Sequence, residues 1–391
     1  MTTVGIVAEW NPFHNGHQRL IDMIRAKESE ACIVSVMSGA FCQRGEAACF
    51  DKWLRAEMAL AAGVDVVLEL PQVYASASLE GFARGGVASL LAFTPLDALY
   101  CGSESGDIAA LTAQAAYLRT HAAAFDVAMR TAGEQGLNYA QASQEFLRAA
   151  GFISDKNTPN DRLALQYRLA LPETVPMRLV QRTVAHDAPE AVAKTMSASQ
   201  IRAALPESLD EVAPYLPPSS VLLMRRTFAE GWQAADTLQF LQALRLLCTS
   251  LEAEDIAERL VIRDGWSPRF LAAVQEAADF EDMLNRAQTR HYSRSRVRRL
   301  ALALLSPLPE APASPGYCHV LGFSKRGRAL LKTRTSNTPL VINTGKDQYK
   351  LSPQARSLLL ADIHRQALAD TLTGRSPMRR DYIEAPRVLL K

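Results

Sequence analysis

The sequence predicts an α/β fold in which a mostly parallel sheet with helices on both faces precedes a mostly helical region. Short apolar runs alternate with helical patterns up to about residue 205, as in a doubly wound sheet. A proline-rich stretch then marks a boundary, and apolar residues beyond it recur at helical spacing. We therefore expect one domain over residues 1–205 and a second, mostly helical and basic domain over residues 206–391.

The first expected strand, Val4–Ala8, leads into the most informative stretch of the chain. Its short apolar run is typical of a buried parallel strand. Pro12 forms a turn after it, because its ring fixes the backbone and keeps Asn11 out of the helical region. Residues 14–17, His-Asn-Gly-His, follow this turn and open a helix whose apolar face begins at Leu20.

Two histidines and a glycine thus lie between a strand's carboxyl end and a helix's first turn. Ligands of open α/β sheets bind at this position, and helix N-terminal amides favour phosphate. Gly16 lets a phosphate approach the backbone, while His14 and His17 can donate hydrogen bonds to a developing charge. A histidine near a helix start is often only a cap or a satisfied core residue. The position after a strand and a turn favours a nucleotide site.

Further strands are expected at residues 31–37, 63–70 and 98–101, and a last one at residues 177–184. Polar and basic side chains follow the second strand, and as a group at the ligand edge of the sheet we expect them to contact phosphate. For any single residue a surface salt bridge is the alternative. These residues are Gln43, Arg44, Lys52 and Arg55.

Three later positions also suit a nucleotide. Gly102 at a strand end lets a base or ribose lie against the backbone, although a simple turn is the alternative. Asn160 or Asp161 is a candidate N-cap. Ser199 can cap a helix in which Arg202 suits phosphate, because a guanidinium binds phosphate through two hydrogen bonds.

Charge is distributed unevenly. The formal net charge is only +2, but residues 286–391 hold 20 Lys and Arg against 6 Asp and Glu, a balance of +14 against −12 for the remainder. A basic C-terminal third suits a polyanion, nucleic acid first. The alternative is a solvated helical surface without a partner.

An arginine-rich run, AQTRHYSRSRVRR, carries much of this charge. It contains no acids that could pair with its arginines along a helix. We expect RNA phosphates to bind Arg290, Arg294, Arg296, Arg298 and Arg299, a base to stack on Tyr292, and the basic residues Lys325 and Arg326 to add to the surface.

Composition also sets limits. No apolar run approaches the ~18–20 residues that span a bilayer, and no signal peptide is visible. The six cysteines include no C-x-x-C pair, so we expect reduced thiols in the cytoplasm. The expectation is a cytoplasmic chain without a membrane contact, and no protein partner is indicated.

The string VGIVAEWNPFHNGH resembles the start of the bacterial tRNA(Met) cytidine acetate ligases, within the HIGH-type nucleotidyltransferase superfamily. The resemblance continues at SGAFCQRGE, GSE, SASQIR, HYSRSRVRR and VLGFSKRGR, whereas residues 254–284 depart from the family's pattern. It implies a Rossmann-like nucleotidyltransferase domain and an ATP-dependent ligase. Such an enzyme adenylates acetate and then acetylates the exocyclic amine of the wobble cytidine in elongator tRNA(Met).

The resemblance also implies roles for individual residues. His14 and His17 would be catalytic, ATP would enter as substrate with Mg²⁺, and no protein ligand for a metal is predicted. Acetate or phosphate would contact Gln43, Arg44, Lys52 and Arg55. The implied ATP contacts are Val7, Ala8, Glu9, Trp10, Asn11, Pro12, Phe13, His14, Asn15, Gly16, His17, Gln18, Arg19, Leu20, Gly102, Asn160, Arg182, Ser199 and Arg202.

Two alternatives stay open at this stage. A small-metabolite adenylyltransferase explains the two nucleotide signatures but leaves the basic C-terminal third unused. An RNA-binding protein with a degenerate nucleotide fold uses the basic third but does not explain the intact His14, Gly16, His17 and Arg202.

Overall fold

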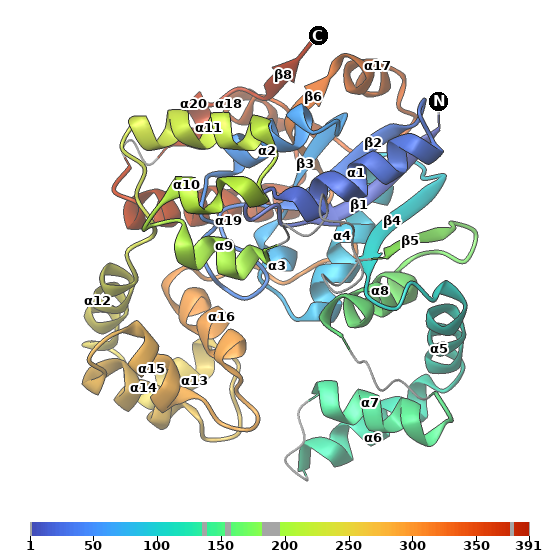
Figure 1. The fold of residues 1–391 in the computed structure, drawn as a ribbon. Coiled ribbons are helices and arrows are strands. Elements are labelled where there is room, and N and C mark those ends of the chain that lie inside the picture. The colour runs from blue at the N-terminus through green and yellow to red at the C-terminus, as the bar shows by residue number, and fades with distance from the viewer. Residues whose placement is uncertain (1, 135–138, 153–157, 182–195, 376–378, 391) are drawn as a thin grey trace.

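A computed structural model describes residues 2–134, 139–152, 158–181, 196–375 and 379–390. Within these residues one sheet has the strand order β5-β4-β1-β2-β3-β6-β7, and β8 also pairs with β6 (Figure 1). The strands are β1 (Thr3–Ala8), β2 (Cys32–Ser38), β3 (Val66–Leu70), β4 (Ala98–Ser103), β5 (Met177–Gln181), β6 (Cys318–Ser324), β7 (Leu340–Val341) and β8 (Arg387–Leu389).

Strand β1 lies in the middle of the parallel part of the sheet. It pairs in parallel with β2 on one side and with β4 on the other. The chain runs outward through β2 and β3 and then returns to place β4 and β5 on the opposite side. The strand order therefore reverses between β1 and β4, and the predicted α/β fold with a parallel sheet is confirmed.

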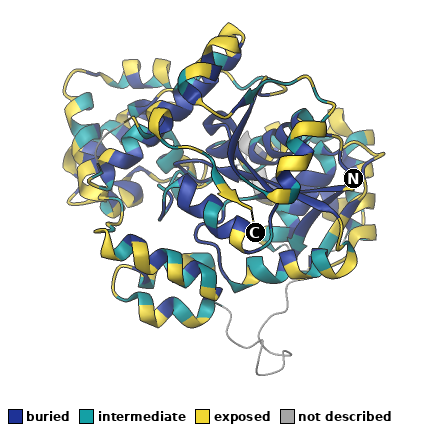
Figure 2. Cartoon of the chain, turned by 90° about the horizontal axis from the view of Figure 1, so that it is seen from above, coloured by how far each residue is buried: buried dark blue, intermediate teal, exposed yellow. Residues whose placement is uncertain are grey.

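Both faces of the sheet are covered, because side chains alternate along each buried strand. On β2, Val34 and Val36 face one core and Ile33 faces the other. The first core contains residues of α3 (Gln72–Ala75), α4 (Leu79–Phe93), α5 (Ile108–Thr120), α7 (Tyr139–Ala149), α8 (Pro159–Ala170), α17 (Lys325–Thr333) and α19 (Pro353–Leu372). The second contains residues of α1 (Asn15–Lys27), α2 (Lys52–Ala61), α9 (Ala198–Ala204), α10 (Leu209–Val212) and α11 (Pro218–Ala229). Figure 2 shows the strands as buried and the outer helix faces as exposed.

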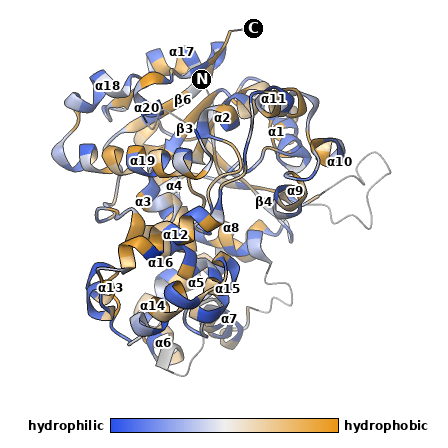
Figure 3. Ribbon diagram, turned by 90° about the vertical axis from the view of Figure 1, so that its left-hand side faces the viewer, coloured by the Kyte–Doolittle hydropathy of each residue, from blue (hydrophilic) through white to orange (hydrophobic). Residues whose placement is uncertain are grey.

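A separate helical unit lies to one side of the sheet (Figure 1). It consists of α12 (Thr237–Cys248), α13 (Ala253–Arg259), α14 (Ser267–Glu276), α15 (Phe280–Ala287) and α16 (Arg294–Leu305). These helices share a core around Leu244, Phe270 and Leu302. Figure 3 shows apolar residues on α12 and α16, which lie side by side.

Helix α6 (Ala122–Glu134) packs on α7 beyond α5. The other remaining elements are short. These short elements are the 3₁₀ turns Ala213–Tyr215 and Gln348–Lys350 and the helices α18 (Thr344–Asp347) and α20 (Arg380–Ile383). Three helices therefore occupy residues 108–149.

The expected division at residue 205 does not describe the sheet. Residues 318–389 return to it as β6, β7 and β8, and β6 runs antiparallel to β3. Strand β5 is therefore not the last strand. Residues 182–184, at the end of the predicted fifth strand, lie outside the described residues. The part that stays off the sheet is the helical unit of residues 237–305.

No helix in the described ranges is both long enough and apolar enough to cross a bilayer.

Two adjacent glycines let helix α4 approach its neighbours closely. A Cβ added to Gly85 would lie 2.2 Å from Cγ of Tyr74, and one added to Gly86 would lie 2.5 Å from Cγ1 of Val7. The helix therefore forms despite the low helix propensity of glycine, because close packing against Tyr74 and β1 compensates for it.

Replacing Gly85 with Ala should destabilise the fold by ~1–3 kcal/mol, because the added methyl group overlaps the buried Tyr74 ring. Urea unfolding would measure the loss. Gly345→Ala in α18 is the matched control, because the nearest atom to its added Cβ is at an ordinary 3.4 Å. Equal stabilities for the two variants would contradict this account.

Candidate active site

The loop that carries both histidines follows the central strand β1, at the point where the strand order reverses. The chain leaves β1 at Ala8 and enters α1 at Asn15. Ligands of doubly wound sheets bind outside the carboxyl ends of the strands at such a reversal. The fold thus places residues 9–17 at the edge where a ligand is expected.

His14 and His17 cap the helix that they begin. Nδ1 of His14 accepts a hydrogen bond from the Gly16 amide at 3.0 Å, and Nδ1 of His17 accepts one from the His14 amide at 3.3 Å. The two rings stack with centroids 3.7 Å apart. Because Nδ1 is an acceptor in each ring, the hydrogen-bond network assigns the ring proton to Nε2.

This arrangement changes one expectation. The Gly16 amide, expected to be open to phosphate, is occupied by the His14 ring. The two caps hold both rings in a fixed orientation, with the ring proton on Nε2.

Buried aromatic side chains pack against the second histidine. Trp10 and Phe13 are fully buried and pack against the His17 ring, with centroid distances of 4.7 and 5.5 Å. Nε1 of Trp10 donates to Oγ of Ser35 on β2 at 3.0 Å, which fixes the indole. Trp10 has a positive φ of 45°, which is uncommon for a residue with a side chain.

Burial divides the predicted ATP contacts of residues 7–20. Those whose side chains are buried, and which therefore shape the loop, are Val7, Trp10, Asn11, Pro12, Phe13, His14 and Leu20. Those that are half-buried or exposed are Ala8, Glu9, Asn15, Gly16, His17, Gln18 and Arg19. Gln18 donates to Asp22 and to the carbonyl of Ala62, so its amide is directed toward α2.

Glu9 is the carboxylate of the loop that carries the histidines. Its Oε1 accepts a hydrogen bond from the Gln43 amide at 2.6 Å. Burial raises the pKa of Glu9, while the Gln43 amide and Arg202 act in the opposite direction. Glu9 therefore takes up a proton more readily than an exposed glutamate.

Arg202 joins helix α9 to the Asn11–Pro12 turn. Its guanidinium donates to the carbonyl of Asn11 at 2.9 Å and pairs with Glu46 at 3.2 Å. The side chain is 21% exposed, so it borders the site without being enclosed. The prediction that Ser199 caps α9 is wrong, because Ser197 is the N-cap and Ser199 lies within the first turn.

Strand β4 ends in a tightly bonded acidic turn. Gly102 precedes Ser103, whose hydroxyl donates to Asp161. Glu104 accepts hydrogen bonds from Thr158 at 2.7 Å and from Asn160 at 2.5 Å. The structure thus brings Gly102 and Asn160 together, although the Asn160 amide is bound to Glu104 here and does not cap α8. Arg182 lies outside the described residues.

Arg55 does not fit its predicted role as a phosphate or acetate contact. It is fully buried, and its guanidinium donates to the carbonyls of Phe50, Glu9, Ser38 and Gly39. It therefore holds together the loops that follow β1 and β2. This correction has a simple cause, since a basic residue at a strand end can satisfy carbonyls as well as bind a ligand.

Gln43 and Arg44 lie in the loop after β2. The Gln43 side chain donates to the carbonyl of Ala77 at 3.0 Å. Arg44 is exposed and has no hydrogen bond or ion pair within the part of the chain that the structure describes. Among the four residues predicted to contact phosphate, Arg44 therefore keeps its guanidinium available to a ligand.

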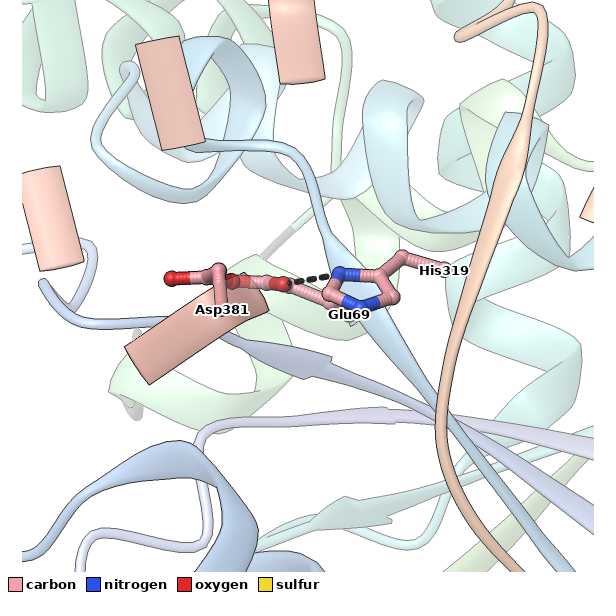
Figure 4. Close-up of side chains that lie close together, drawn as sticks. All are labelled: Glu69, His319 and Asp381. Carbon is pink, nitrogen blue, oxygen red and sulfur yellow. Dashed lines mark hydrogen bonds and ion pairs between the residues drawn. The ribbon is translucent and has the colours of Figure 1, made fainter. Parts of the chain in front are cut away.

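Lys52 is also fully buried and does not reach the site. Its ammonium lies 2.8 Å from Oε2 of Glu69 and 2.5 Å from Oδ1 of Asp381. His319 donates to Glu69 from Nδ1 at 2.6 Å (Figure 4). Ligand atoms of Glu69, His319 and Asp381 lie within 4.8 Å of one another, as in a metal site, but the Lys52 ammonium already pairs with both carboxylates. The predicted phosphate or acetate contact of Lys52 is therefore corrected to a structural ion pair.

Burial alone would raise the pKa of Glu69, but Lys52 and His319 outweigh it and lower the pKa to about 2. A lowered carboxylate pKa stabilises the fold above the ordinary value of 4.5, and the stabilisation is lost as pH falls toward 2. At neutral pH we expect this ionisation to make the unfolding free energy of wild type larger than that of Glu69→Gln by on the order of 3 kcal/mol. Urea unfolding between neutral pH and pH ~2 should show the difference shrinking. A difference that stays constant with pH would refute the predicted stabilisation by the ionised Glu69 side chain.

The arginine-rich run begins helix α16, and the structure corrects one role within it. Tyr292 is buried, stacks on Trp266 with centroids 4.2 Å apart and lies under the Arg296 guanidinium at 4.0 Å. Its hydroxyl donates to Asp264 at 2.8 Å. Both ring faces are occupied, so Tyr292 cannot serve as the predicted platform for a base.

The arginines of this run differ in exposure. Arg290 and Arg296 are exposed, whereas Arg294 pairs with Glu281 and Arg299 donates to the carbonyl of Gln43. Arg298 pairs with Glu46 at 2.5 Å and with Glu281 at 2.8 Å. Acids from elsewhere in the chain thus supply the partners that the run itself lacks.

Lys325 and Arg326 lie at the opposite end of the parallel strands from the histidines. They begin α17, and Arg326 donates to the carbonyls of Ser29 and Ala31, just before β2. The histidines lie at the carboxyl end of β1, which runs parallel to β2. The structure therefore does not bring these two residues together with the arginines of α16.

Several contacts of the site were missed at the sequence level. Asp161 was named only as a candidate N-cap, and Thr158 is the N-cap of α8. Glu46 bridges Arg202 and Arg298, and Glu104 and Asp161 organise the turn after β4. Glu46 and Glu104 are carboxylates in loops that follow strand ends, and Asp161 lies in the first turn of α8. What the sequence could not show was which distant residue each one binds.

Comparison with known proteins agrees with the fold. The model of the HIGH nucleotidyl transferase family matches residues 1–380, so the fold and the paired histidines define a nucleotidyl transferase of this class. The tRNA(Met) cytidine acetate ligase of Caldanaerobacter subterraneus subsp. tengcongensis is 33% identical over 90% of each chain. The enzyme of the same name from Bacillus licheniformis is 32% identical over the full length of both. The chain belongs to the tRNA(Met) cytidine acetate ligase family.

A solved structure shows the same similarity in three dimensions. The crystal structure of Thermotoga maritima TmcAL bound with alpha-thio ATP covers all of this chain and all of its own, with a TM-score of 0.86 and 27% identity.

Proposed function

We propose that this chain is an ATP-dependent ligase that activates acetate as acetyl-adenylate and transfers the acetyl group to the exocyclic amine of a cytidine in tRNA(Met). The observation that carries the proposal is the stacked pair His14 and His17 at the reversal of strand order, with Nδ1 of each ring bound to the backbone. The names of the relatives support the substrates, and the ATP analogue bound to the Thermotoga maritima protein supports ATP as the nucleotide.

In the first step a carboxylate oxygen of acetate attacks the α-phosphorus of ATP, and pyrophosphate leaves with the electron pair of the broken P–O bond. The protein needs to orient the reactants and stabilise the charge that develops. Nε2–H donors of His14 and His17 suit the phosphate oxygens. Arg202, at the mouth of the loop, suits the pyrophosphate.

We expect Mg²⁺ to accompany ATP and to neutralise phosphate charge. The three-residue group Glu69, His319 and Asp381 does not fit this ion, because Lys52 already provides the cation there. We therefore assign Mg²⁺ no ligand from that cluster.

In the second step the cytidine amine attacks the acetyl carbonyl carbon, the C–O bond to the phosphate breaks, the amine loses a proton and AMP leaves. No cysteine or serine nucleophile is required. The described cysteines are free, and five of the six are buried. Exposed Arg290 and Arg296 beside the site provide charge for RNA phosphates. A tRNA substrate also suits the expected cytoplasmic location.

Changing His17 to Ala or His14 to Asn should lower the rate of adenylate formation by ~10²–10³, the loss typical of one charge-stabilising donor. Asparagine is chosen for His14 because it preserves an N-cap. ATP–pyrophosphate exchange with acetate measures the step. His364→Ala, on an exposed part of α19, is the control and should keep wild-type exchange. Near-normal exchange by a folded His17→Ala protein would refute the assignment.

The same exchange assay with a panel of carboxylic acids, with and without bulk tRNA, tests the substrates. Acetate-dependent exchange supports the ligase. Exchange that requires a different acid or a phosphorylated metabolite would instead indicate the small-metabolite adenylyltransferase.

Changing Arg290 and Arg296 together to Ala should weaken tRNA binding by about tenfold or more and lower the slope of log affinity against log salt by roughly 2, because two fewer phosphates are neutralised. Binding titrations across salt concentrations measure both. The control is Arg328→Ala with Lys332→Ala, an equal charge change on exposed positions of α17. Equal losses in both variants would mean that only net charge matters and would remove the special role of α16.

A further inference from the structure

A cavity of about 200 Å³ lies where the sheet domain meets the helical unit. One wall is the loop after β2 with the end of α9, and the other is formed by α12, α15 and α16. Of the residues given a role in the first step, Arg202 lines this cavity. A single water needs about 10–15 Å³ of such space, so the cavity has room for a planar base.

The cavity lies next to residues that hold the histidine loop in place. Arg202 and Cys49 both line it, and both bind Asn11, three residues before His14. The Arg202 guanidinium donates to the Asn11 carbonyl at 2.9 Å, and the Cys49 amide donates to the Asn11 side chain at 2.8 Å. A group bound in the cavity is therefore separated from the histidine loop by one layer of residues.

The walls of the cavity combine flat apolar surfaces with charged groups at one side. Phe41, Trp232, Phe240 and Phe280 provide aromatic surface. Of the two acids in the lining, Asp236 is committed to the amides of Leu238 and Gln239 as the cap of α12.

Glu46 is the other acid. It holds Arg202 through Oε2 and Arg298 through Oε1. A carboxylate has about four lone-pair positions, so Glu46 can accept a further hydrogen bond.

These groups match one class of ligand. A carboxylate accepts from the exocyclic amine of cytosine, an arginine donates to ring acceptors, and aromatic walls hold an unstacked base. Acetate would gain nothing from apolar walls. Arg298, a half-buried lining residue, supplies positive charge at the cavity that suits an RNA phosphate.

We propose that this cavity receives the target base, a cytosine turned out of the RNA loop, with its exocyclic amine directed at Glu46. This proposal rests on the proposed function, since it names where the RNA substrate of that reaction binds. Enzymes that modify a base commonly extrude it into such a pocket.

The first test fills the cavity. Ala235→Leu adds bulk at a half-buried lining position, and Ala278→Leu, exposed in the same helical unit and outside the lining, is the matched control. Each protein is titrated with a tRNA transcript and with the same transcript made abasic at the target position. Wild type and control should prefer the intact transcript by about tenfold or more, whereas Ala235→Leu should bind both equally.

Acetate-dependent adenylate formation by Ala235→Leu should stay within about twofold of wild type, while acetyl transfer should fall by about 100-fold or more. A filled variant that keeps its preference for the intact transcript, or transfers acetyl at the wild-type rate, would overturn the cavity assignment.

A second variant tests the role of Glu46 without filling the cavity. Wild type should prefer cytidine over uridine at the target position by about tenfold. Glu46→Gln should lose this preference, because an amide can donate to the uracil O4 as well as accept from cytosine. An unchanged preference would overturn the assignment of Glu46.

The two proposals fail in different ways. If wild type forms no acetyl-adenylate, the proposed function is wrong, while base-dependent binding lost in Ala235→Leu would still support the cavity. If wild type acetylates tRNA and the filled variant does so equally well, only the cavity assignment is wrong.

Discussion

The capping of α1 by its own two histidines is the constraint on which the active site depends. A helix start leaves amides without partners, and serine or aspartate usually satisfies them. Here the Nδ1 atoms of His14 and His17 do so, which fixes both ring orientation and tautomer. Two charged rings 3.7 Å apart would repel each other and would give up both caps. The arrangement therefore favours neutral rings that act as oriented hydrogen-bond donors.

Holding this loop in place requires segments that are far apart in the sequence. Trp10 is fixed by Ser35 of β2, Asn11 contacts Cys42 and Cys49 of the next loop, and Arg202 arrives from α9. Buried Arg55 ties the carbonyls of the same loops together. These polar groups of the histidine loop thus have hydrogen-bond partners, and a hydrogen-bonded network of this kind is rigid.

The C-terminal part of the chain completes the sheet domain. Glu69 at the end of β3 binds Lys52 of α2 and His319 of β6, and Lys52 also binds Asp381 of α20. Removing one partner would leave a buried charge without compensation, which typically costs about 3–5 kcal/mol. This cluster explains why residues 318–389 belong with the sheet and why a linear boundary near residue 205 is misleading.

Local patterns in the sequence were sufficient for the strands of the parallel sheet and for the placement of His14, Gly16 and His17. An apolar run followed by a turn and a helix start is determined by neighbours in the chain. The roles of Lys52, Arg55 and Tyr292 were mispredicted for the opposite reason, because each depends on distant residues that bury it. Strands β6 to β8 were missed because they are short or lie in segments dominated by basic motifs. Ser197 was missed because Ser199 offers the same side chain two residues later.

Glu46 shows how the two halves of the proposed reaction share one group. It pairs with Arg202, which borders the histidine loop, and with Arg298, in the second turn of α16. A phosphate that binds Arg202 competes with Glu46 for the same guanidinium, since the fork offers a limited number of N–H groups. In the proposed reaction, a nucleotide phosphate bound to Arg202 would weaken the pair between Glu46 and Arg202 and leave more of the carboxylate's acceptor capacity directed at the cavity. Occupation of the proposed nucleotide site would then prepare the proposed base site, because both draw on a single carboxylate.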